Sequence, residues 1–414
     1  MPKNPIYSNL QILKSDLGWF VRKSIDFLVI KTPNKQTFEL PRKKKLLIVR
    51  TDAIGDFVIF TGILPYFREL YPSQEWEITL LGSKECRTIA EFVQSDIISS
   101  ESVFDKFIPI DRFAFSRNLI YRFQFHKKIL QNLYYDVIIY PAYSRSRDGD
   151  QLVNIINSPA KVAIDGNCSN IPLAVKQRNN QTIYSKIIKS KEGWLSEVER
   201  NVNFIKELGI KKSIDGIPRW KVPSELVETS INLVKSKGIE GDFAVVCPGA
   251  SASYRVWSPE KVATVIDYLW CEYKITTVIC GSPQDKTSSL EIQKSLKSAK
   301  VICLCGETNL IQLSAIMSYA KLCITMDSGP AHIAVAVNSP LICVIGGGHY
   351  KRFFPYGDPN RFRAATEELD CFYCNWKCKY GTPFCVKDIS VTTVIKEIDQ
   401  LISTICNSTI QGKG

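Results

Sequence analysis

The stretch Thr325–His332 brings together the end of an apolar run, a Gly-Pro pair and a titratable imidazole. The preceding run, 321–326, predicts a buried parallel strand, and Asp327 or Ser328 can cap a helix that begins directly afterwards. Backbone N–H groups at such a helix start, helped by the helix dipole, favour an anion such as a diphosphate. The stretch is therefore a candidate anion-binding turn, although an ordinary strand-to-helix turn with a capping Asp fits the same residues.

Three more turns, whose residue types suit the binding of a nucleotide, follow predicted strands in the second half of the chain. They are Cys247–Ser251, Gly281–Asp285 and Gly346–Gly348. Ligands of open α/β sheets bind outside the carboxyl ends of the strands, so these turns predict a nucleotide site at one edge of a sheet. Neither a P-loop nor a GxGxxG pattern after a strand occurs in the sequence, which argues against a Walker-type ATPase and a dinucleotide dehydrogenase.

Arg255 precedes a predicted helix that starts near Pro259. Its fixed positive charge beside the backbone amides of Gly249, Ala250 and Ser251 would form a clamp for a diphosphate. The alternative is an ordinary solvated arginine in a loop.

The first half of the chain contains a second chemical candidate, the segment Arg50–Asp56, which follows the first predicted strand. Gly55 would let the backbone approach a substrate closely. Asp56 can take a proton from an incoming hydroxyl as a general base, or it can merely cap a helix that begins at Phe57.

The elements that must position these residues alternate between strand and helix. Strands are predicted at 46–49, 76–81, 137–140, 243–246, 276–280, 301–303, 322–326 and 341–345, and helices near 57–71, 194–208, 259–273, 286–298 and 309–319. This alternation predicts an α/β fold with two parallel sheets facing a central cleft. The expected organisation is an N-terminal extension at 1–41, an acceptor-side domain at 42–212, a linker at 213–222, a nucleotide-binding domain at 223–388, and a C-terminal helix and tail at 389–414.

The length of 414 residues suits two domains, and 45% hydrophobic residues can supply their cores. A net charge of +12 favours anionic partners. We expect a cytoplasmic protein, because no apolar run is long enough to span a membrane and the N-terminus lacks the apolar core of a secretory signal. Residues 6–30 are basic and have apolar residues at near-helical spacing, which fits either a helix on an anionic membrane or a helix packed on the first domain.

The sequence has 14 cysteines, and many lie inside apolar strand-like runs where cysteine acts as a small hydrophobe. A disulfide scaffold is not expected at this length. Four others cluster near the C-terminus with a Cys-x2-Cys pair, namely Cys371, Cys374, Cys378 and Cys385. This spacing is compatible with structural zinc, and packed or reversibly oxidised thiols are the alternative.

Several of these motifs, taken in order, resemble glycosyltransferase family 9, the ADP-heptose:lipopolysaccharide heptosyltransferases. The similarity extends over about residues 45–400 and is carried by segments 47–56, 248–250, 255–259, 327–332 and 354–357. The resemblance implies a GT-B fold, in which two Rossmann-like halves bind the acceptor and the nucleotide sugar.

The resemblance also implies roles for individual residues. Asp56 is similar to the catalytic base of the family, and Arg255 to a basic residue on the donor phosphates. The implied donor-binding residues are Gly249, Ala250, Ser251, Arg255, Asp285, Asp327, Ser328, Gly329 and His332, and the acceptor-binding candidates are Arg50, Gly55, Arg145 and Arg147. Because amides and Arg255 can stabilise the leaving diphosphate, no cofactor is required, and zinc is considered only as a structural ion.

The function expected from these observations is inverting transfer of a heptose-type sugar from an ADP-sugar to a lipopolysaccharide core or related anionic glycan. The enzyme would act peripherally at the inner face of the cytoplasmic membrane. Two alternatives remain at this point: a transferase that uses another nucleotide sugar in capsule or O-chain synthesis, and a non-catalytic nucleotide-binding protein. No nucleic-acid partner is expected, because no helix-turn-helix, RNP or tandem zinc-finger pattern occurs.

Overall fold

The structure is a computed structural model that describes residues 24, 42–94, 101–130 and 133–411. The expected N-terminal extension, 1–41, lies outside the described residues apart from Ser24. The chain forms two compact units, and each is described by itself. The first comprises Met1–Asp52, Arg68–Arg87 and Phe104–Ser190, and the second comprises Ala53–Phe67, Thr88–Val103 and Lys191–Gly414.

The first unit is built on a six-stranded parallel sheet with the order β3-β2-β1-β4-β5-β6. The residues Leu46 to Val49 of β1 are completely buried, as expected for a central parallel strand covered on both faces. The strands are β1 (Lys44–Arg50), β2 (Trp76–Ser83), β3 (Lys106–Ile110), β4 (Val137–Tyr140), β5 (Ala160–Ile164) and β6 (Lys186–Ile188). The helices are α5 (Arg112–Arg117), α6 (Leu119–Phe125), a π-helical turn (His126–Leu130), α7 (Arg147–Ile155) and α8 (Leu173–Thr182).

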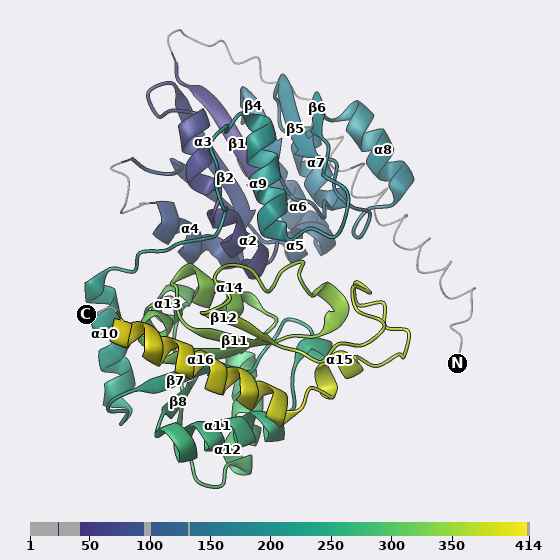
Figure 1. Cartoon of the computed structure of the whole chain (residues 1–414). Helices are drawn as coiled ribbons and strands as arrows, with labels where there is room; N and C mark the ends of the chain where they lie inside the picture. Colours follow the sequence, from purple (N-terminus) through teal and green to yellow (C-terminus); the bar gives the residue numbers. More distant parts are fainter. Residues whose placement is uncertain (1–23, 25–41, 95–100, 131–132, 412–414) are drawn as a thin grey trace. The chain divides into compact units, whose positions relative to one another are not determined.

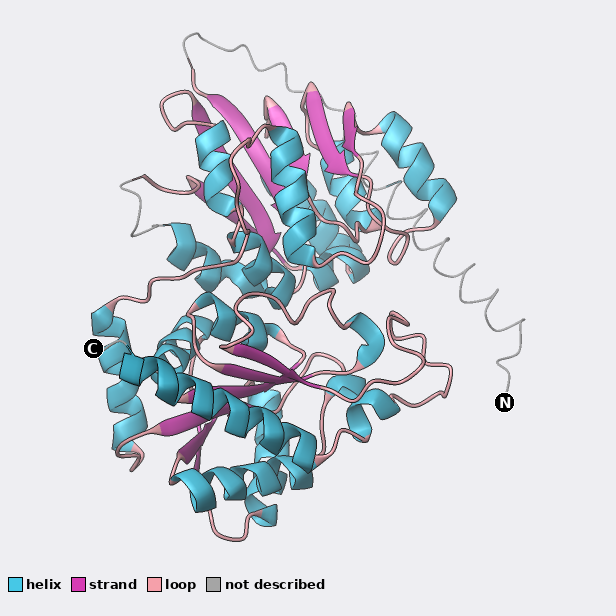
Figure 2. Ribbon diagram, viewed as in Figure 1, coloured by secondary structure: helices cyan, strands magenta, loops and turns pink. Residues whose placement is uncertain are grey.

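The second unit repeats this architecture with the order β12-β11-β10-β7-β8-β9, also parallel throughout. The strands are β7 (Phe243–Cys247), β8 (Thr276–Ile279), β9 (Val301–Cys303), β10 (Leu322–Met326), β11 (Leu341–Val344) and β12 (Phe362–Ala365). Figure 2 shows the strands of each sheet in magenta among cyan helices. Both sheets have the strand order of a doubly wound fold, so the predicted α/β class with two parallel sheets is confirmed.

Helices from both ends of the chain belong to the second unit. They are α2 (Ile54–Thr61), α9 (Glu197–Leu208), α10 (Ser224–Ser236), α11 (Pro259–Tyr273), α12 (Lys286–Ser295), α13 (Leu310–Tyr319), α14 (Gly329–Ala336), α15 (Phe384–Lys387) and α16 (Val391–Gln411). The last of these, yellow in Figure 1, packs on β11, β12 and α11 and buries Val394, Ile398 and Leu401 in the core. Two further helices, α3 (Leu64–Leu70) and α4 (Arg87–Gln94), have residues in both units.

The predicted helix at 57–71 is two helices in the structure, with α2 ending at Thr61 and α3 starting at Leu64. Pro65 explains the break, because proline cannot donate the backbone hydrogen bond that a continuous helix would require there.

The helix predicted at 194–208 begins at Glu197 instead, where Ser196 and Glu199 form a capping box. Gly209 ends it, with a φ of 137° that favours glycine.

Candidate active site

Two turns that are far apart in the sequence meet at the carboxyl end of the second sheet. Arg255 donates hydrogen bonds to the backbone oxygen of Asp327 (3.1 Å) and to Oγ of Ser251 (2.7 Å). These turns follow β7 and β10, which are the neighbouring strands at which the strand order reverses. Such a switch point is where open α/β sheets bind ligands. The structure thus brings together three residues that the sequence assigned to one diphosphate site.

The side chain of Asp327 lies behind this arginine and is buried. Its Oδ2 is 3.8 Å from the Nη1 of Arg255 and, in the described part of the chain, has no hydrogen-bond partner. Burial raises the pKa of Asp327, and the positive charge of Arg255 acts in the opposite direction. The arginine therefore offsets part of the desolvation cost of a carboxylate directly beneath the turn.

The helix after this turn, α14, has Ser328 at its N-cap position and Gly329 and Pro330 in its first turn. No side chain caps it, because Oγ of Ser328 donates to the backbone oxygen of Met326 (3.3 Å) instead. The expectation that Asp327 or Ser328 caps the helix through its side chain was therefore wrong. The arrangement leaves the first backbone N–H groups of α14 without a side-chain cap, as suits a helix start that binds an anion.

The imidazole of His332 lies between α14 and α2. Its Nδ1 is 3.1 Å from the hydroxyl of Tyr356, and the two rings are stacked with an interplanar angle of 17°. Burial, and secondarily the charge of Arg255, lower the pKa of His332 to about 3, so the ring is neutral near pH 7. On its other side lies Gly55, where an added Cβ would be only 2.8 Å from Cδ2 of His332. A larger residue at position 55 would displace the imidazole or α2.

Asp56 follows Gly55 directly and occupies the first turn of α2. The N-cap residue of α2 is Ala53, so Asp56 is not the capping residue considered from the sequence. Helix α2 packs against α14, and an added Cβ at Gly329 would lie 3.1 Å from Cγ2 of Ile54. Asp56 is half-buried. The candidate base is therefore next in sequence to the residue in contact with His332, within the same compact unit as the donor turns.

Asp285 was expected at the donor and is instead packed between two turns. Its carboxylate accepts hydrogen bonds from the backbone N (2.7 Å) and Oγ (2.7 Å) of Ser282. An added Cβ would lie 2.1 Å from this carboxylate at Gly249 and 2.7 Å from it at Gly281. These contacts give Asp285 a role in holding the Gly249 and Gly281 turns together, and donor binding by it stays a prediction. Ala250, next to Gly249, is partly buried against the core of the unit.

The Gly346–Gly348 turn, proposed from the sequence to face a nucleotide, is covered by the cysteine-rich segment. Tyr373 and Asn375 donate backbone hydrogen bonds to the oxygens of Gly347 (2.8 Å) and Gly348 (3.0 Å). A Cβ added at Gly347 would lie 2.1 Å from a ring atom of Phe372, and one added at Gly348 would lie 2.4 Å from a ring atom of Trp376. The glycines are thus explained by close packing of this segment, which corrects the expectation of an open nucleotide turn.

The four clustered cysteines are free thiols, and Cys385 alone among them is fully buried. Burial raises the pKa of Cys378 and Cys385. A hydrogen bond from the backbone of Gly347 acts against this for Cys385, and the neighbouring thiols of the cluster raise the pKa of both. Among the residues that the structure describes, no three His, Cys, Asp or Glu side chains are placed so that they could hold a metal ion. The spacing of the cysteines alone supports structural zinc, which stays a prediction.

The expected acceptor arginines belong to the first unit, and two of them are fully buried. Arg50 pairs with Asp52 (2.9 Å), and Arg145 hydrogen-bonds Asn180 and lies 3.6 Å from Asp150. The structure corrects the expectation that Arg50 and Arg145 face an acceptor, because both guanidinium groups are enclosed with carboxylates inside the unit. Arg147, the first residue of α7, is partly exposed and remains a candidate.

Sequence reasoning missed two features around the site. Tyr356, which orients His332, lies in the segment Phe354–Gly357 that had been noted only as a motif. The loop that bears it is held by a buried ion pair between Arg352 and Glu197 (2.9 Å) and by a hydrogen bond from Trp194 to the backbone oxygen of Tyr350 (2.8 Å). No local sequence pattern indicates such pairs, because the partners are distant in the sequence.

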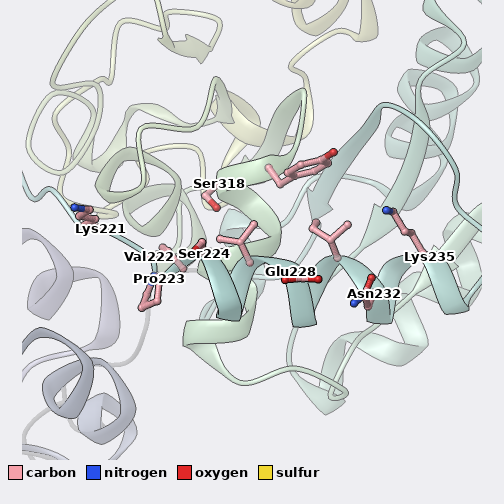
Figure 3. A pocket seen from close by; sticks show the side chains of 11 residues that line it. Lys221, Val222, Pro223, Ser224, Glu228, Asn232, Lys235 and Ser318 are labelled. Atoms are coloured by element: carbon pink, nitrogen blue, oxygen red, sulfur yellow. The ribbon is translucent and has the colours of Figure 1, made fainter. Parts of the chain in front are cut away.

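A separate groove of about 920 Å³ lies on the second unit, between α10 and α13. Figure 3 shows Lys221, Glu228, Asn232 and Lys235 along it. None of the predicted site residues lines this groove, so it is distinct from the candidate active site.

Replacing Arg255 by Ala is expected to weaken ADP binding by about 1–3 kcal/mol, because a charge-assisted contact to the diphosphate is lost. Calorimetric titration with ADP measures the effect. Arg219→Ala, which removes an exposed arginine paired with Asp215, is the matched control and should leave the affinity unchanged. Equal affinities for ADP in all three proteins would contradict a donor role for Arg255.

Comparisons with known proteins identify the family of the chain. The family model described as "Glycosyltransferase family 9 (heptosyltransferase)" matches residues 170–377. Lipopolysaccharide heptosyltransferase 3 of Escherichia coli is 27% identical over 162 residues, which are 39% of this chain and 47% of the relative. The chain thus matches about half the length of this curated relative.

Solved structures show the same fold over most of the chain. A glycosyl transferase family 9 protein from Veillonella parvula has a TM-score of 0.69 at 19% identity and covers 89% of this chain and 99% of its own. E. coli heptosyltransferase WaaC with ADP-2-deoxy-2-fluoro heptose has a TM-score of 0.60 at 16% identity, with coverages of 86% and 99%. With its family model spanning half of the 414 residues, the chain belongs to glycosyltransferase family 9.

Proposed function

We propose that this chain is an inverting glycosyltransferase that moves a heptose-type sugar from an ADP-sugar to a lipopolysaccharide core or related anionic glycan. The observation that carries the proposal is the meeting of Arg255, Ser251 and Asp327 at the switch point of the second sheet. Asp56 lies on the helix packed against the same turn. The similarity to lipopolysaccharide heptosyltransferase 3, and to WaaC with its fluorinated ADP-heptose, supports this donor and acceptor class.

In the proposed reaction, the carboxylate of Asp56 accepts the proton of an acceptor hydroxyl as that oxygen attacks the anomeric carbon. The bond from this carbon to the diphosphate oxygen breaks, and direct displacement inverts the anomeric configuration. The guanidinium of Arg255 and the backbone amides at the start of α14 stabilise the negative charge on the leaving diphosphate. We propose that these groups suffice without a metal cofactor.

In this proposal His332 acts through the position and packing of its ring and carries no charge. Its lowered pKa keeps the imidazole neutral, and the contact with Tyr356 fixes the orientation of the ring. A neutral ring adds no further positive charge that would compete with Arg255 for the diphosphate. It also holds the close contact with Gly55 that places Asp56 beside α14.

The experiment that tests the proposal is a product assay with ADP-heptose and a deacylated lipopolysaccharide core oligosaccharide. The expected result is a new glycosidic bond with inverted anomeric configuration, read by NMR, together with release of ADP. A product of retained configuration would contradict the mechanism. No release of ADP under any acceptor condition would contradict the activity.

Two other functions make different predictions. A transferase for capsule or O-chain synthesis would release another nucleoside diphosphate, which a screen of nucleotide sugars by thermal shift would detect. A non-catalytic nucleotide-binding protein would be stabilised by ADP and yet form no product. The position of Asp56 beside the donor turns favours the enzyme over the non-catalytic protein.

The proposed acceptor places the protein at the inner face of the cytoplasmic membrane, as a peripheral enzyme. No helix among the described residues is long and apolar enough to cross a membrane. The net charge of +12 suits both an anionic glycolipid and the acidic lipid surface around it. No nucleic-acid partner is part of this proposal.

Structural zinc at Cys371, Cys374, Cys378 and Cys385 stays a prediction from spacing. Metal analysis of the purified chain tests it directly. A zinc content far below one equivalent would contradict it, and the thiols would then serve as packing groups against the Gly346–Gly348 turn.

A further inference from the structure

Five large apolar side chains of the first unit are exposed on α5, on α6 and on the π-helical turn that follows them. They form what we call the α5–α6 face, which consists of Phe113, Leu119, Ile120, Phe123 and Ile129. Ile120 is the most exposed large hydrophobic residue described, at 70%. Residues 119 and 123, and residues 120 and 123, are neighbours on a helical surface, so these side chains form a patch on α6. Figure 1 places α5 and α6 side by side in the first unit, where they also contact each other.

Exposed aromatic residues of the second unit also lie in contact, since the ring centres of Trp194 and Tyr373 are 5.2 Å apart and those of Tyr380 and Phe384 are 6.1 Å apart. Leu173 on α8 and Leu290 on α12 are each the one exposed large hydrophobic residue described on their helix. Single exposed residues of this kind are normal on soluble proteins, whereas a contiguous patch marks an interaction surface. The α5–α6 face differs from the aromatic pairs of the second unit because three of its five side chains are aliphatic.

The sequence of the α5–α6 face is rich in positive charge, and two acidic side chains lie beside it, because Asp111 caps α5 and Asp148 pairs with Arg122. The sequence from Arg112 to Tyr135 contains five Lys or Arg residues and no Asp or Glu. Arg122 is buried and paired with Asp148, whereas Arg117 and Lys127 are exposed. The guanidinium groups of Arg112 and Arg117 lie 4.7 and 5.6 Å from the ring centre of Phe113. Apolar side chains bordered by cations that lie over aromatic rings are typical of the membrane interface, where the chains insert and the cations reach the headgroups.

We propose that the α5–α6 face docks the protein on an anionic lipid bilayer. The inference rests on the proposed function, because a membrane glycolipid acceptor requires the enzyme to work at a bilayer. Anionic headgroups complement the exposed Arg117 and Lys127, and the acyl boundary takes up Ile120 and Phe123.

The charges on the chain argue against other occupants. Residues 1–41 carry six Lys or Arg and three Asp or Glu, so this segment has the same sign of charge as the face. A second copy of the chain would oppose two cationic borders across one interface, which is unfavourable. An anionic lipid surface attracts the cations of the face, so neither of these two like-charge repulsions arises.

Co-sedimentation of the full-length protein with vesicles tests the proposal. Wild type should bind vesicles of phosphatidylethanolamine and phosphatidylglycerol and not vesicles of phosphatidylcholine, and added salt should weaken the binding. The double variants Ile120→Ser/Phe123→Ser and Arg117→Glu/Lys127→Glu should each lower the partition coefficient about tenfold or more. Leu290→Ser and Lys294→Glu on α12 are matched controls that should bind as wild type does. Circular dichroism and thermal melting identify any variant that fails to fold, and the charge variant then carries the test alone.

Four outcomes would overturn the docking proposal. The first is wild type that does not bind anionic vesicles. The second is face variants that bind as tightly as the α12 controls. The third is binding that is lost on deletion of residues 1–41 and kept in the face variants, which would make the N-terminal segment the anchor. The fourth is that the wild type sediments as a dimer and the face variants sediment as monomers. The α5–α6 face would then be an interface between two copies of the chain.

The same proteins separate this proposal from the proposed function. Turnover of ADP-heptose with a deacylated, water-soluble core acceptor should be the same in wild type and in the face variants, because that acceptor needs no membrane. Vesicle binding by a protein with no such turnover would overturn the proposed function and leave the docking surface standing. Normal turnover in a protein whose vesicle binding does not depend on the α5–α6 face would overturn the docking proposal and leave the proposed function standing.

Discussion

Replacement of Asp56 by Asn is expected to lower kcat for sugar transfer by about 10²- to 10⁴-fold, the range associated with the loss of a general base. The amide keeps the size of the carboxylate and cannot accept a proton from the acceptor hydroxyl. Binding of ADP should be unchanged, since the proposal assigns the diphosphate to Arg255, which contacts Asp327 and Ser251, and to the start of α14. Initial rates with ADP-heptose and a deacylated core acceptor, together with calorimetric titration of ADP, measure both effects.

A matched control separates the chemistry of Asp56 from a general effect of charge at a helix start. Glu225 is likewise an acidic residue in the first turn of a helix, α10, and is exposed. Glu225→Gln should leave kcat unchanged. A rate for Asp56→Asn within a few-fold of wild type would remove Asp56 from the mechanism, and equal losses in both variants would indicate a structural effect.

Much of the fold could be predicted because its signals are local. The completely buried apolar run of β1 and the short apolar run 322–326 identify parallel strands without reference to any other segment. Gly209 and the Ser-Pro pair at 258–259 mark helix ends, and both do so in the structure. The turns that we propose bind the donor could be located for the same reason, since each directly follows a strand.

The parts that could not be predicted depend on contacts between distant segments. Nothing local shows that α2 belongs to the second compact unit, where Gly55 lies against His332. The three glycines at 346–348 look like a phosphate-binding turn because close approach of a ligand and close packing of a ring both require the same residue. Only the structure shows Phe372 and Trp376 at that turn. Arg50 and Arg145 were misassigned in a similar way, since an arginine after a strand looks the same in sequence whether it is exposed or paired inside.

The buried ion pair between Glu197 and Arg352 leads to the largest stability effect that we expect. The side chains are 4% and 9% exposed, and Nε of Arg352 lies 2.9 Å from Oε1 of Glu197. Removing one partner of such a pair leaves the other charge buried without its counterpart, so Glu197→Ala should cost about 3–5 kcal/mol. The pair between Arg363 and Glu397 is 23% and 20% exposed, so Glu397→Ala should cost about 0–1 kcal/mol after solvent screening. Urea unfolding of the two variants compares them directly.

The Glu197 variant also tests how the loop that carries Tyr356 is held. Arg352 lies in that loop, and Tyr356 orients His332, so loosening the pair should weaken ADP binding as well as lower stability. The double variant Glu197→Leu/Arg352→Met should recover most of the stability, because an apolar pair of similar volume avoids the desolvation cost of both charges. Recovery of stability and of ADP affinity together would show that the position of the loop matters and the charges do not. Equal destabilisation by Glu197→Ala and Glu397→Ala would contradict the assignment of a buried, structurally important pair.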